Sequence, residues 1–325
     1  MQLEGKKVFI TGATGFVGGY ITQALHQQKA QIIALKGKKN DTSLIDDIKD
    51  DIQWEDADIL DPNTLQEILQ GIDYVVHTAS IVSFDKGIDE LRAINVNGTA
   101  NLVNMSLECG IKKFIHISSI AALGVPEYGN QIDENSKWTG DKGVSAYGIS
   151  KYNSEQEVWR GYREGLDVVV LNPSVILGVG DFKRSSLTIL GLIQKGVKYY
   201  PTGNFSSVDI RDVVTAVIKS FDDNINGERY ILNAHSIPFQ RALEIISRGF
   251  NVTPPKKKIT KKISKLVYYL EGGIKLITRR KRKLSKDLLR TLYSKKEYKN
   301  AKAIKELQLQ FRPLEETMQW VKDHQ

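Results

Sequence analysis

Apolar residues follow two alternating spacings through the first half of the chain. Short apolar runs predict strands at 7–10, 31–35, 73–77, 113–118 and 167–171. Between them, apolar residues recur every three or four positions and predict helices at 16–28, 89–108 and 144–161, with a further helix start at Asp61-Pro62. The strand runs are rich in valine and isoleucine without polar alternation, as in strands covered on both faces. The pattern predicts an α/β fold with a doubly wound parallel sheet.

The pattern becomes mixed after residue 180. A strand is expected at 228–232 and a helix at 238–248, and from 254 onward the sequence is basic and mostly helical. We therefore expect residues 1–180 to form the sheet domain, joined by segments that return to it from about 205–232. Residues 181–325 are then expected to supply mainly a smaller, mostly helical lobe.

A glycine-rich turn directly follows the first predicted strand. Gly12, Gly15 and Gly18 stand three apart between an apolar strand and a helix. Gly12 permits a tight turn, Gly15 lets a phosphate approach the backbone, and Gly18 allows helix and strand to pack closely. Because N–H groups at a helix N-terminus bind pyrophosphate, this turn predicts a dinucleotide site. The alternative is an ordinary turn between a strand and a helix.

The end of the second predicted strand bears on which dinucleotide binds. Sites that prefer NAD place a carboxylate there to accept from the ribose hydroxyls. This chain has Lys36-Gly37-Lys38-Lys39 instead. Three lysines suit a 2′-phosphate and favour NADP(H), while NAD(H) stays open and a solvated lysine loop is the alternative. Asp58 follows a further short strand, expected between residue 35 and the helix start at Asp61-Pro62, and could accept from the adenine amino group or cap the next turn.

Candidate catalytic residues lie on the helix predicted at 144–161. Tyr147 and Lys151 stand four apart, which places them on one face. The neighbouring ammonium is expected to lower the pKa of the phenol, so that Tyr147 can exchange a proton with a substrate oxygen. Ser118-Ser119 ends a predicted strand at the edge where doubly wound sheets bind ligands, and a serine there can orient a carbonyl. Asn95, on the preceding helix, could provide a link behind Lys151.

These motifs together resemble the extended short-chain dehydrogenases/reductases, which share the NAD-dependent epimerase/dehydratase fold. The matching elements span about residues 6–180 and are Thr11 to Gly18, His77-Thr78-Ala79-Ser80, Asn95-Val96-Asn97-Gly98-Thr99, Ser118-Ser119, Tyr147 to Lys151 and Asn172-Pro173-Ser174. The resemblance implies a catalytic triad of Ser119, Tyr147 and Lys151, with Asn95 as a fourth member. It also implies a homodimer through the helices at 89–108 and 144–161.

The expected cofactor contacts combine the glycine turn, the ends of the strands and the catalytic helix. They are Gly12, Thr14, Gly15, Phe16, Val17, Gly18, Lys36, Asp58, Ile59, Thr78, Ala79, Ser80, Tyr147, Lys151, Pro173 and Ser174. Within the family, the chain looks nearer to dihydroflavonol-reductase-like and 3β-hydroxysteroid-dehydrogenase-like members than to sugar-nucleotide epimerases. The reason is the run from Asn172 to Gly178, which stands where the sugar-nucleotide branch commonly has Arg-Pro-x-x-Val-Tyr-Gly.

Charge divides the chain unevenly. Residues 251–325 carry 21 lysines and arginines against seven acidic residues, whereas the rest of the chain is mildly acidic. This distribution argues against nucleic acid as a partner and indicates an anionic surface met only by the C-terminal part. Basic clusters around 256–262 and at 279–283 flank an amphipathic stretch, so residues 256–283 could contact anionic lipid. We expect instead a helical lid whose apolar residues Leu266, Val267 and Leu270 pack on the substrate pocket.

The expected function is an NADP(H)-dependent oxidoreductase that interconverts a ketone and a secondary alcohol on a small organic substrate. The alternatives are an NAD(P)-dependent epimerase or dehydratase of a sugar nucleotide and a non-catalytic dinucleotide sensor. The five histidines lack ligand spacing, so no metal site is expected. The single cysteine, Cys109, excludes an internal disulfide and suits the cytoplasm, with peripheral membrane contact as a further option.

Overall fold

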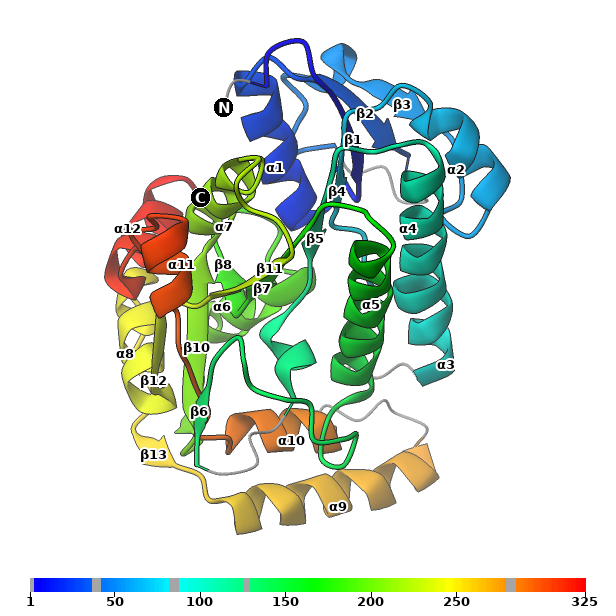
Figure 1. Cartoon of the computed structure of the whole chain (residues 1–325). Coiled ribbons are helices and arrows are strands. Elements are labelled where there is room, and N and C mark those ends of the chain that lie inside the picture. The colour runs from blue at the N-terminus through cyan, green and yellow to red at the C-terminus, as the bar shows by residue number, and fades with distance from the viewer. Residues whose placement is uncertain (1–2, 37–41, 82–87, 125–128, 279–284) are drawn as a thin grey trace.

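The structure is a computed structural model that describes residues 3–36, 42–81, 88–124, 129–278 and 285–325 (Figure 1). Within these residues the main sheet has seven strands, all parallel. Their spatial order is β3 (Gln53–Glu55), β2 (Gln31–Leu35), β1 (Lys7–Thr11), β4 (Tyr74–His77), β5 (Lys113–Ile117), β7 (Val168–Pro173) and β11 (Glu228–Leu232). The order reverses between β1 and β4, and ligands of such sheets bind at the carboxyl ends of the strands at this switch point.

Helices cover both faces of the main sheet. One face carries α1 (Phe16–Gln27), α7 (Ile210–Lys219) and α11 (Ala301–Glu306), whose apolar side chains join those of the strands in one core cluster. The other face carries α2 (Pro62–Leu69), α4 (Gly98–Glu108) and α5 (Ala146–Arg163), which complete a second cluster. The doubly wound parallel sheet predicted from the sequence is therefore confirmed.

The helix predicted at 89–108 is interrupted in the structure. It comprises α3 (Ile88–Leu91), a π-helical segment at Arg92–Asn97, and α4. Asn95 lies in the π-helical segment, and its side chain is buried and bonded to other parts of the chain. A π-bulge is common where a helix must aim a side chain at a functional site.

The C-terminal lobe is built on a second sheet that the apolar pattern did not reveal. Its strands are β8 (Val175–Leu177), β10 (Asn204–Asp209) and β12 (His235–Pro238), and its covering helices are α6 (Thr188–Gln194), α8 (Phe239–Gly249) and α12 (Leu314–Asp323). β10 was missed because its buried positions include Ser206 and Ser207, which are polar. β8 was missed because three residues carry no periodic signal. The lobe is mostly helical, as expected, and the division of the chain at residue 180 stays a prediction.

The remaining elements lie at the end of the lobe. Two short parallel pairs are β9 (Tyr199–Tyr200) with β13 (Lys257–Lys258), and β6 (Gln131–Ile132) with β14 (Glu297–Tyr298). Helices α9 (Lys261–Thr278) and α10 (Lys286–Leu292) run along the lower edge of the molecule in Figure 1. Short 3-10 turns lie at Lys49–Asp51, Ile120–Leu123 and Ser185–Leu187.

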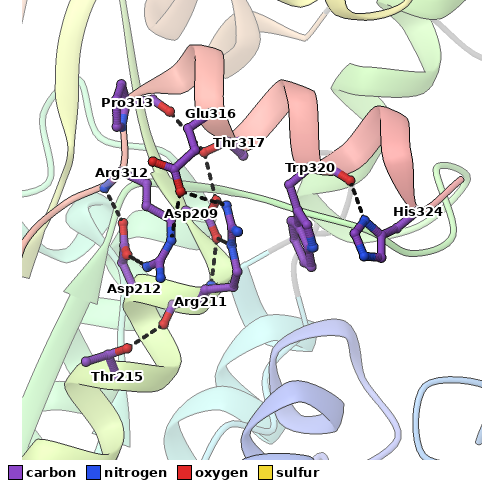
Figure 2. A network of polar contacts seen from close by, with 10 residues as sticks. All are labelled: Asp209, Arg211, Asp212, Thr215, Arg312, Pro313, Glu316, Thr317, Trp320 and His324. Carbon is purple, nitrogen blue, oxygen red and sulfur yellow. Dashed lines mark hydrogen bonds and ion pairs between the residues drawn. The ribbon is translucent and has the colours of Figure 1, made fainter.

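A polar network fastens the C-terminal helix α12 to β10 and α7 (Figure 2). Asp209 caps α7, receives two hydrogen bonds from the Arg211 guanidinium and accepts a third from the Thr317 hydroxyl at 2.8 Å. Asp212, also buried, accepts from the Arg312 backbone N–H at 2.8 Å and from its guanidinium. The Arg211 guanidinium lies 4.3 Å from the centre of the Trp320 ring. The end of the chain is thereby held beside the sheet domain.

Candidate active site

The turn between β1 and α1 has the geometry of a phosphate loop. Gly12 has a φ of 77°, which favours glycine, and its carbonyl oxygen accepts from the Gly15 N–H at 2.9 Å. A Cβ on Gly18 would lie 2.0 Å from the Gly12 oxygen, so only glycine fits there. Gly15 caps α1 with no side-chain hydrogen bond, and the first turn of the helix holds no acidic residue. The N-terminus of α1 therefore offers N–H groups and a positive dipole end to an anion.

The segment after β4 closes the side of this loop. The Thr78 hydroxyl donates to the Thr11 carbonyl oxygen at 2.7 Å, and the Ala79 N–H donates to the Thr11 hydroxyl at 3.2 Å. A Cβ on Gly12 would approach the Thr78 oxygen to 2.6 Å, so the two segments touch at the switch point. The Ser80 hydroxyl is buried and has no hydrogen-bond partner among the residues that the structure describes. An orphaned hydroxyl beside a glycine loop fits a bound dinucleotide, which would supply the missing partner.

The other expected cofactor contacts are placed as follows. Thr14, Phe16 and Val17 are half-buried at the start of α1. Pro173 ends β7, and the N–H and hydroxyl of Ser174 both donate to the Leu232 oxygen, at 2.9 and 3.3 Å. The polar groups of Ser174 are therefore engaged by the neighbouring strand.

The end of β2 leaves the cofactor preference undecided. Lys36 is exposed, and Gly37, Lys38 and Lys39 lie outside the described residues. Asp58 is exposed, and its carboxylate accepts from the Leu60 N–H at 3.0 Å, so it does cap the following turn. Ile59 is buried against Gly98, where an added Cβ would lie 2.9 Å from the isoleucine side chain.

The structure brings three of the four expected catalytic residues together at the carboxyl end of β5. Ser119 caps the 3-10 turn at Ile120–Leu123, and its hydroxyl accepts from the Ala121 N–H at 3.1 Å. That hydroxyl is also hydrogen-bonded to the phenol of Tyr147, in the first turn of α5. The two elements touch because Gly148 leaves room: a Cβ there would lie 2.9 Å from the Ala121 oxygen. Lys151 follows one turn along the same helix.

The two titratable groups of this set are both shifted by burial. Burial raises the pKa of Tyr147 to about 12, and the hydrogen bond to Ser119 acts in the opposite direction. Burial lowers the pKa of Lys151 to about 8, and the carboxylate of Glu155 acts against that shift. The expectation that Lys151 lowers the pKa of Tyr147 is wrong for this geometry. The Lys151 ammonium donates instead to the Ile117 carbonyl oxygen at 2.8 Å.

Asn95 supports the site through backbone and helix contacts. Its amide oxygen accepts from the Ile81 N–H at 2.8 Å, and its amide nitrogen donates to the Ile81 oxygen and the Ser150 hydroxyl, each at 3.1 Å. It therefore joins the segment after Ser80 to α5 at the residue next to Lys151. The link that was expected from Asn95 to the region behind Lys151 is made through Ser150, the residue before Lys151.

A buried carboxylate beneath the site was missed by the sequence reasoning. Glu155 is fully buried and accepts from the Ser118 hydroxyl and the Asn172 amide, each at 2.5 Å, and from the Arg229 guanidinium. The Asn172 amide also donates to the Ser119 carbonyl oxygen at 3.0 Å. Glu155 thus ties the ends of β5 and β7 to Arg229, near the start of β11. Glu155 lies four residues after Lys151 and eight after Tyr147, and this helical spacing was the signal in the sequence that could have placed it beside them.

Two histidines of the sheet interior complete the surroundings. His77 is bonded to the hydroxyls of Thr11 and Thr99 at 2.7 and 2.9 Å, and His116 lies 5.2 Å from it between ring centres. Burial, with repulsion from Lys151, lowers the pKa of His77 to about 3 and that of His116 well below its usual value. Both rings are therefore neutral. In the described parts of the chain no group of three or more His, Cys, Asp and Glu residues could hold a metal ion.

Comparison with known proteins supplies the family. The model of the NAD dependent epimerase/dehydratase family matches residues 8–233. The chain belongs to this family. It is thus an extended short-chain dehydrogenase/reductase, an oxidoreductase with an NAD-binding Rossmann sheet, as the sequence motifs predicted.

Individual relatives agree with that assignment. A Synechocystis protein assigned as a dihydroflavonol 4-reductase is 30% identical over 77% of this chain and 74% of its own. Sterol demethylase protein B of Methylococcus capsulatus is 27% identical over 92% of both chains. The crystal structure of gox2253 superposes with a TM-score of 0.83 at 27% identity and covers 98% of both chains. UDP-glucose 4-epimerase of Thermotoga maritima, at 18% identity with a TM-score of 0.78 and 98% coverage of both chains, shares the fold.

Proposed function

We propose that this member of the family is an NADP(H)-dependent reductase or dehydrogenase that interconverts a ketone and a secondary alcohol. The observation that carries the proposal is the hydrogen bond between Ser119 and the Tyr147 phenol, on the same carboxyl edge of the sheet as the glycine loop. Relatives named dihydroflavonol 4-reductase and cinnamoyl-CoA reductase support a reductase over an epimerase. The substrate is a small organic carbonyl compound or alcohol.

In the proposed mechanism, the bound nicotinamide supplies or accepts the hydride. The Ser119 hydroxyl donates to the substrate oxygen and holds it beside Tyr147. Tyr147 keeps its proton at neutral pH, since burial raises its pKa to about 12, and this suits donation to the developing alkoxide. Lys151 would hold the cofactor ribose, one helical turn beyond Tyr147. Asn95 and Glu155 fix the segments that carry these side chains.

The proton donor is tested by replacing Tyr147 with Phe. We expect turnover to fall by roughly 10²–10⁴-fold with cofactor affinity nearly unchanged, because only the phenol proton is lost. Lys151→Ala should weaken both turnover and cofactor binding. Tyr162→Phe is the matched control, because Tyr162 is on the same helix and 41% exposed. The mechanism is wrong if Tyr147→Phe keeps wild-type turnover on a substrate that the wild type reduces.

The preference for NADP(H) rests on Lys36 and the neighbouring lysines of the sequence, together with the missing carboxylate at the end of β2. Fluorescence titration with NADPH and NADH should give tighter binding of NADPH. Lys36→Gln should weaken the binding of NADPH and leave the binding of NADH unchanged, since only NADPH carries the 2′-phosphate. Tighter binding of NADH by the wild type would refute the preference.

We also propose a homodimer through α4 and α5, the helices that the family resemblance indicated. Light scattering of the purified chain should give twice its mass of 36.5 kDa. A monomer at micromolar concentration would refute this assembly.

A further inference from the structure

Helix α9 is attached to the lobe by polar contacts and leaves apolar residues in solvent. Its one buried described side chain, Ser264, is hydrogen-bonded to the Tyr293 hydroxyl at 2.5 Å. That hydroxyl in turn donates to the Ile259 oxygen at 3.1 Å. Figure 1 shows α9 along the outer edge of the molecule, beside α10 and away from the main sheet. The inner face of the helix is thus fixed through Ser264, and the described residues Ile263, Leu266, Val267 and Tyr269 are exposed.

The exposed residues of α9 form an apolar stripe. Ile263, Leu266 and Val267 are 50%, 60% and 36% exposed, and their spacing of three and four puts them on one side of the helix. Tyr269, next to this side, is 68% exposed. The expectation of a lid packed on the substrate pocket is therefore wrong for Leu266 and Val267. The side chain of Leu270, the third residue of that expectation, lies outside the described residues.

Lysines surround the stripe, and the next acidic residue along the chain is Glu271, later in the same helix. The sequence from 252 to 270 holds six lysines and no acidic residue. The structure exposes all of them: Lys256, Lys257, Lys258, Lys261, Lys262 and Lys265. No carboxylate in the described chain forms an ion pair with any of the six. Unpaired lysines beside exposed apolar residues are the pattern of helices that lie in the interface of an anionic bilayer.

We propose that the segment 256–269 is a docking surface for an anionic lipid bilayer. The apolar stripe enters the acyl boundary while the lysines meet lipid phosphates. Tyr269 suits the interface, because its ring is apolar and its hydroxyl polar. Across the described chain, no helix is long and apolar enough to cross a bilayer, so α9 lies in the plane of the surface.

A second copy of the chain fits this surface less well than lipid does. Two copies meeting through residues 256–269 would bring twelve exposed lysines together, with no carboxylate in that segment of either copy, and like charges at an interface are unfavourable. Anionic lipid supplies the opposite charge and an apolar phase at once. The inference is independent of the proposed chemistry, because it rests on residues outside the candidate active site.

The test is co-sedimentation of the full chain with vesicles of phosphatidylglycerol and phosphatidylcholine. Binding should rise with the phosphatidylglycerol fraction and fall as salt is added, because the surface field is screened within a Debye length. Lys262→Gln with Lys265→Gln should weaken binding roughly 30-fold, the equivalent of about 1 kcal/mol for each lysine. The matched control is Lys305→Gln with Lys322→Gln, two exposed lysines of other helices, which should leave binding unchanged.

The apolar stripe is tested separately. Leu266→Gln should reduce vesicle binding, whereas Leu192→Gln should not, although Leu192 is 61% exposed and Leu266 60%. Equal binding of the wild type to neutral and anionic vesicles would overturn the proposal. The proposal would also be overturned if the wild type self-associates but does not bind vesicles, and Leu266→Gln abolishes the self-association. The surface would then be occupied by a second copy of the chain. A changed KM in Leu266→Gln with no vesicle binding would restore the lid.

Discussion

The buried carboxylate of Glu155 provides the sharpest test of how the site is held. Three donors meet on it: the Ser118 hydroxyl, the Asn172 amide and the Arg229 guanidinium. The Glu155 side chain is 0% exposed, and that of Arg229 is 18% exposed. Replacing Glu155 with Gln keeps the shape of the side chain but removes its charge. The new amide N–H₂ group then faces at least one of these three donors, which loses its acceptor.

The expected cost follows from burial. Removing one member of a buried ion pair destabilises a protein by about 3–5 kcal/mol, because the remaining charge stays buried without a partner. This loss is a large fraction of a typical free energy of unfolding, about 5–15 kcal/mol. Urea denaturation of wild type and Glu155→Gln, followed by circular dichroism, measures the difference directly. Turnover should fall as well, because Asn172 also holds the Ser119 carbonyl oxygen.

Two further variants make the measurement decisive. Glu157→Gln, on the same helix, removes an ion pair with Arg160 whose side chains are both about 30% exposed, and should cost less than 1 kcal/mol. Adding Arg229→Met to Glu155→Gln should recover part of the stability, since the unpaired charge is then gone. The reasoning fails if Glu155→Gln lowers the free energy of unfolding by no more than Glu157→Gln does. It also fails if the loss of stability in the double variant equals the sum of the losses of Glu155→Gln and Arg229→Met.

Two more predictions concern the phosphate loop and Lys151. Gly18→Ala should abolish dinucleotide binding in a fluorescence titration, because its Cβ would lie 2.0 Å from the Gly12 oxygen; Gly19→Ala, whose Cβ would lie 3.1 Å from Leu44, should keep it. Lys151 has a folded pKa of about 8, below its ordinary 10.5, so the unfolded chain binds more protons there between these values. The stability of the wild type relative to Lys151→Met should therefore rise from pH 8 to 10.5, by about 3 kcal/mol; a flat difference in urea denaturation would contradict the shift.

The sequence alone was enough to place the glycine-rich turn and the helix that carries Tyr147 and Lys151. Gly12, Gly15 and Gly18 stand between a strand and a helix in adjacent positions of the chain, so local spacing defines the turn. The helical repeat likewise sets Tyr147 and Lys151 on one face. These features depend on neighbours in sequence, and the structure places them where the pattern indicated.

Features that depend on distant segments could not be predicted. Glu155 resembles any solvated helix glutamate until the sheet brings Ser118, Asn172 and Arg229 to it. Strand β10 was hidden because its buried serines find partners only in the folded lobe: Ser206, for example, is bonded to Ser236 of β12.

The sequence by itself therefore determined the doubly wound sheet, the glycine turn and the placing of Tyr147 and Lys151 on one helix face, since each follows from local periodicity and turn chemistry. The tertiary structure decided the state of those groups. Burial, opposed by the hydrogen bond to Ser119, sets the pKa of Tyr147, and the Lys151 charge that the sequence suggested as the cause is not among its causes. Tertiary packing also decided that the apolar residues Leu266 and Val267 of α9 face solvent, because the helix is attached to the lobe through Ser264 on another side.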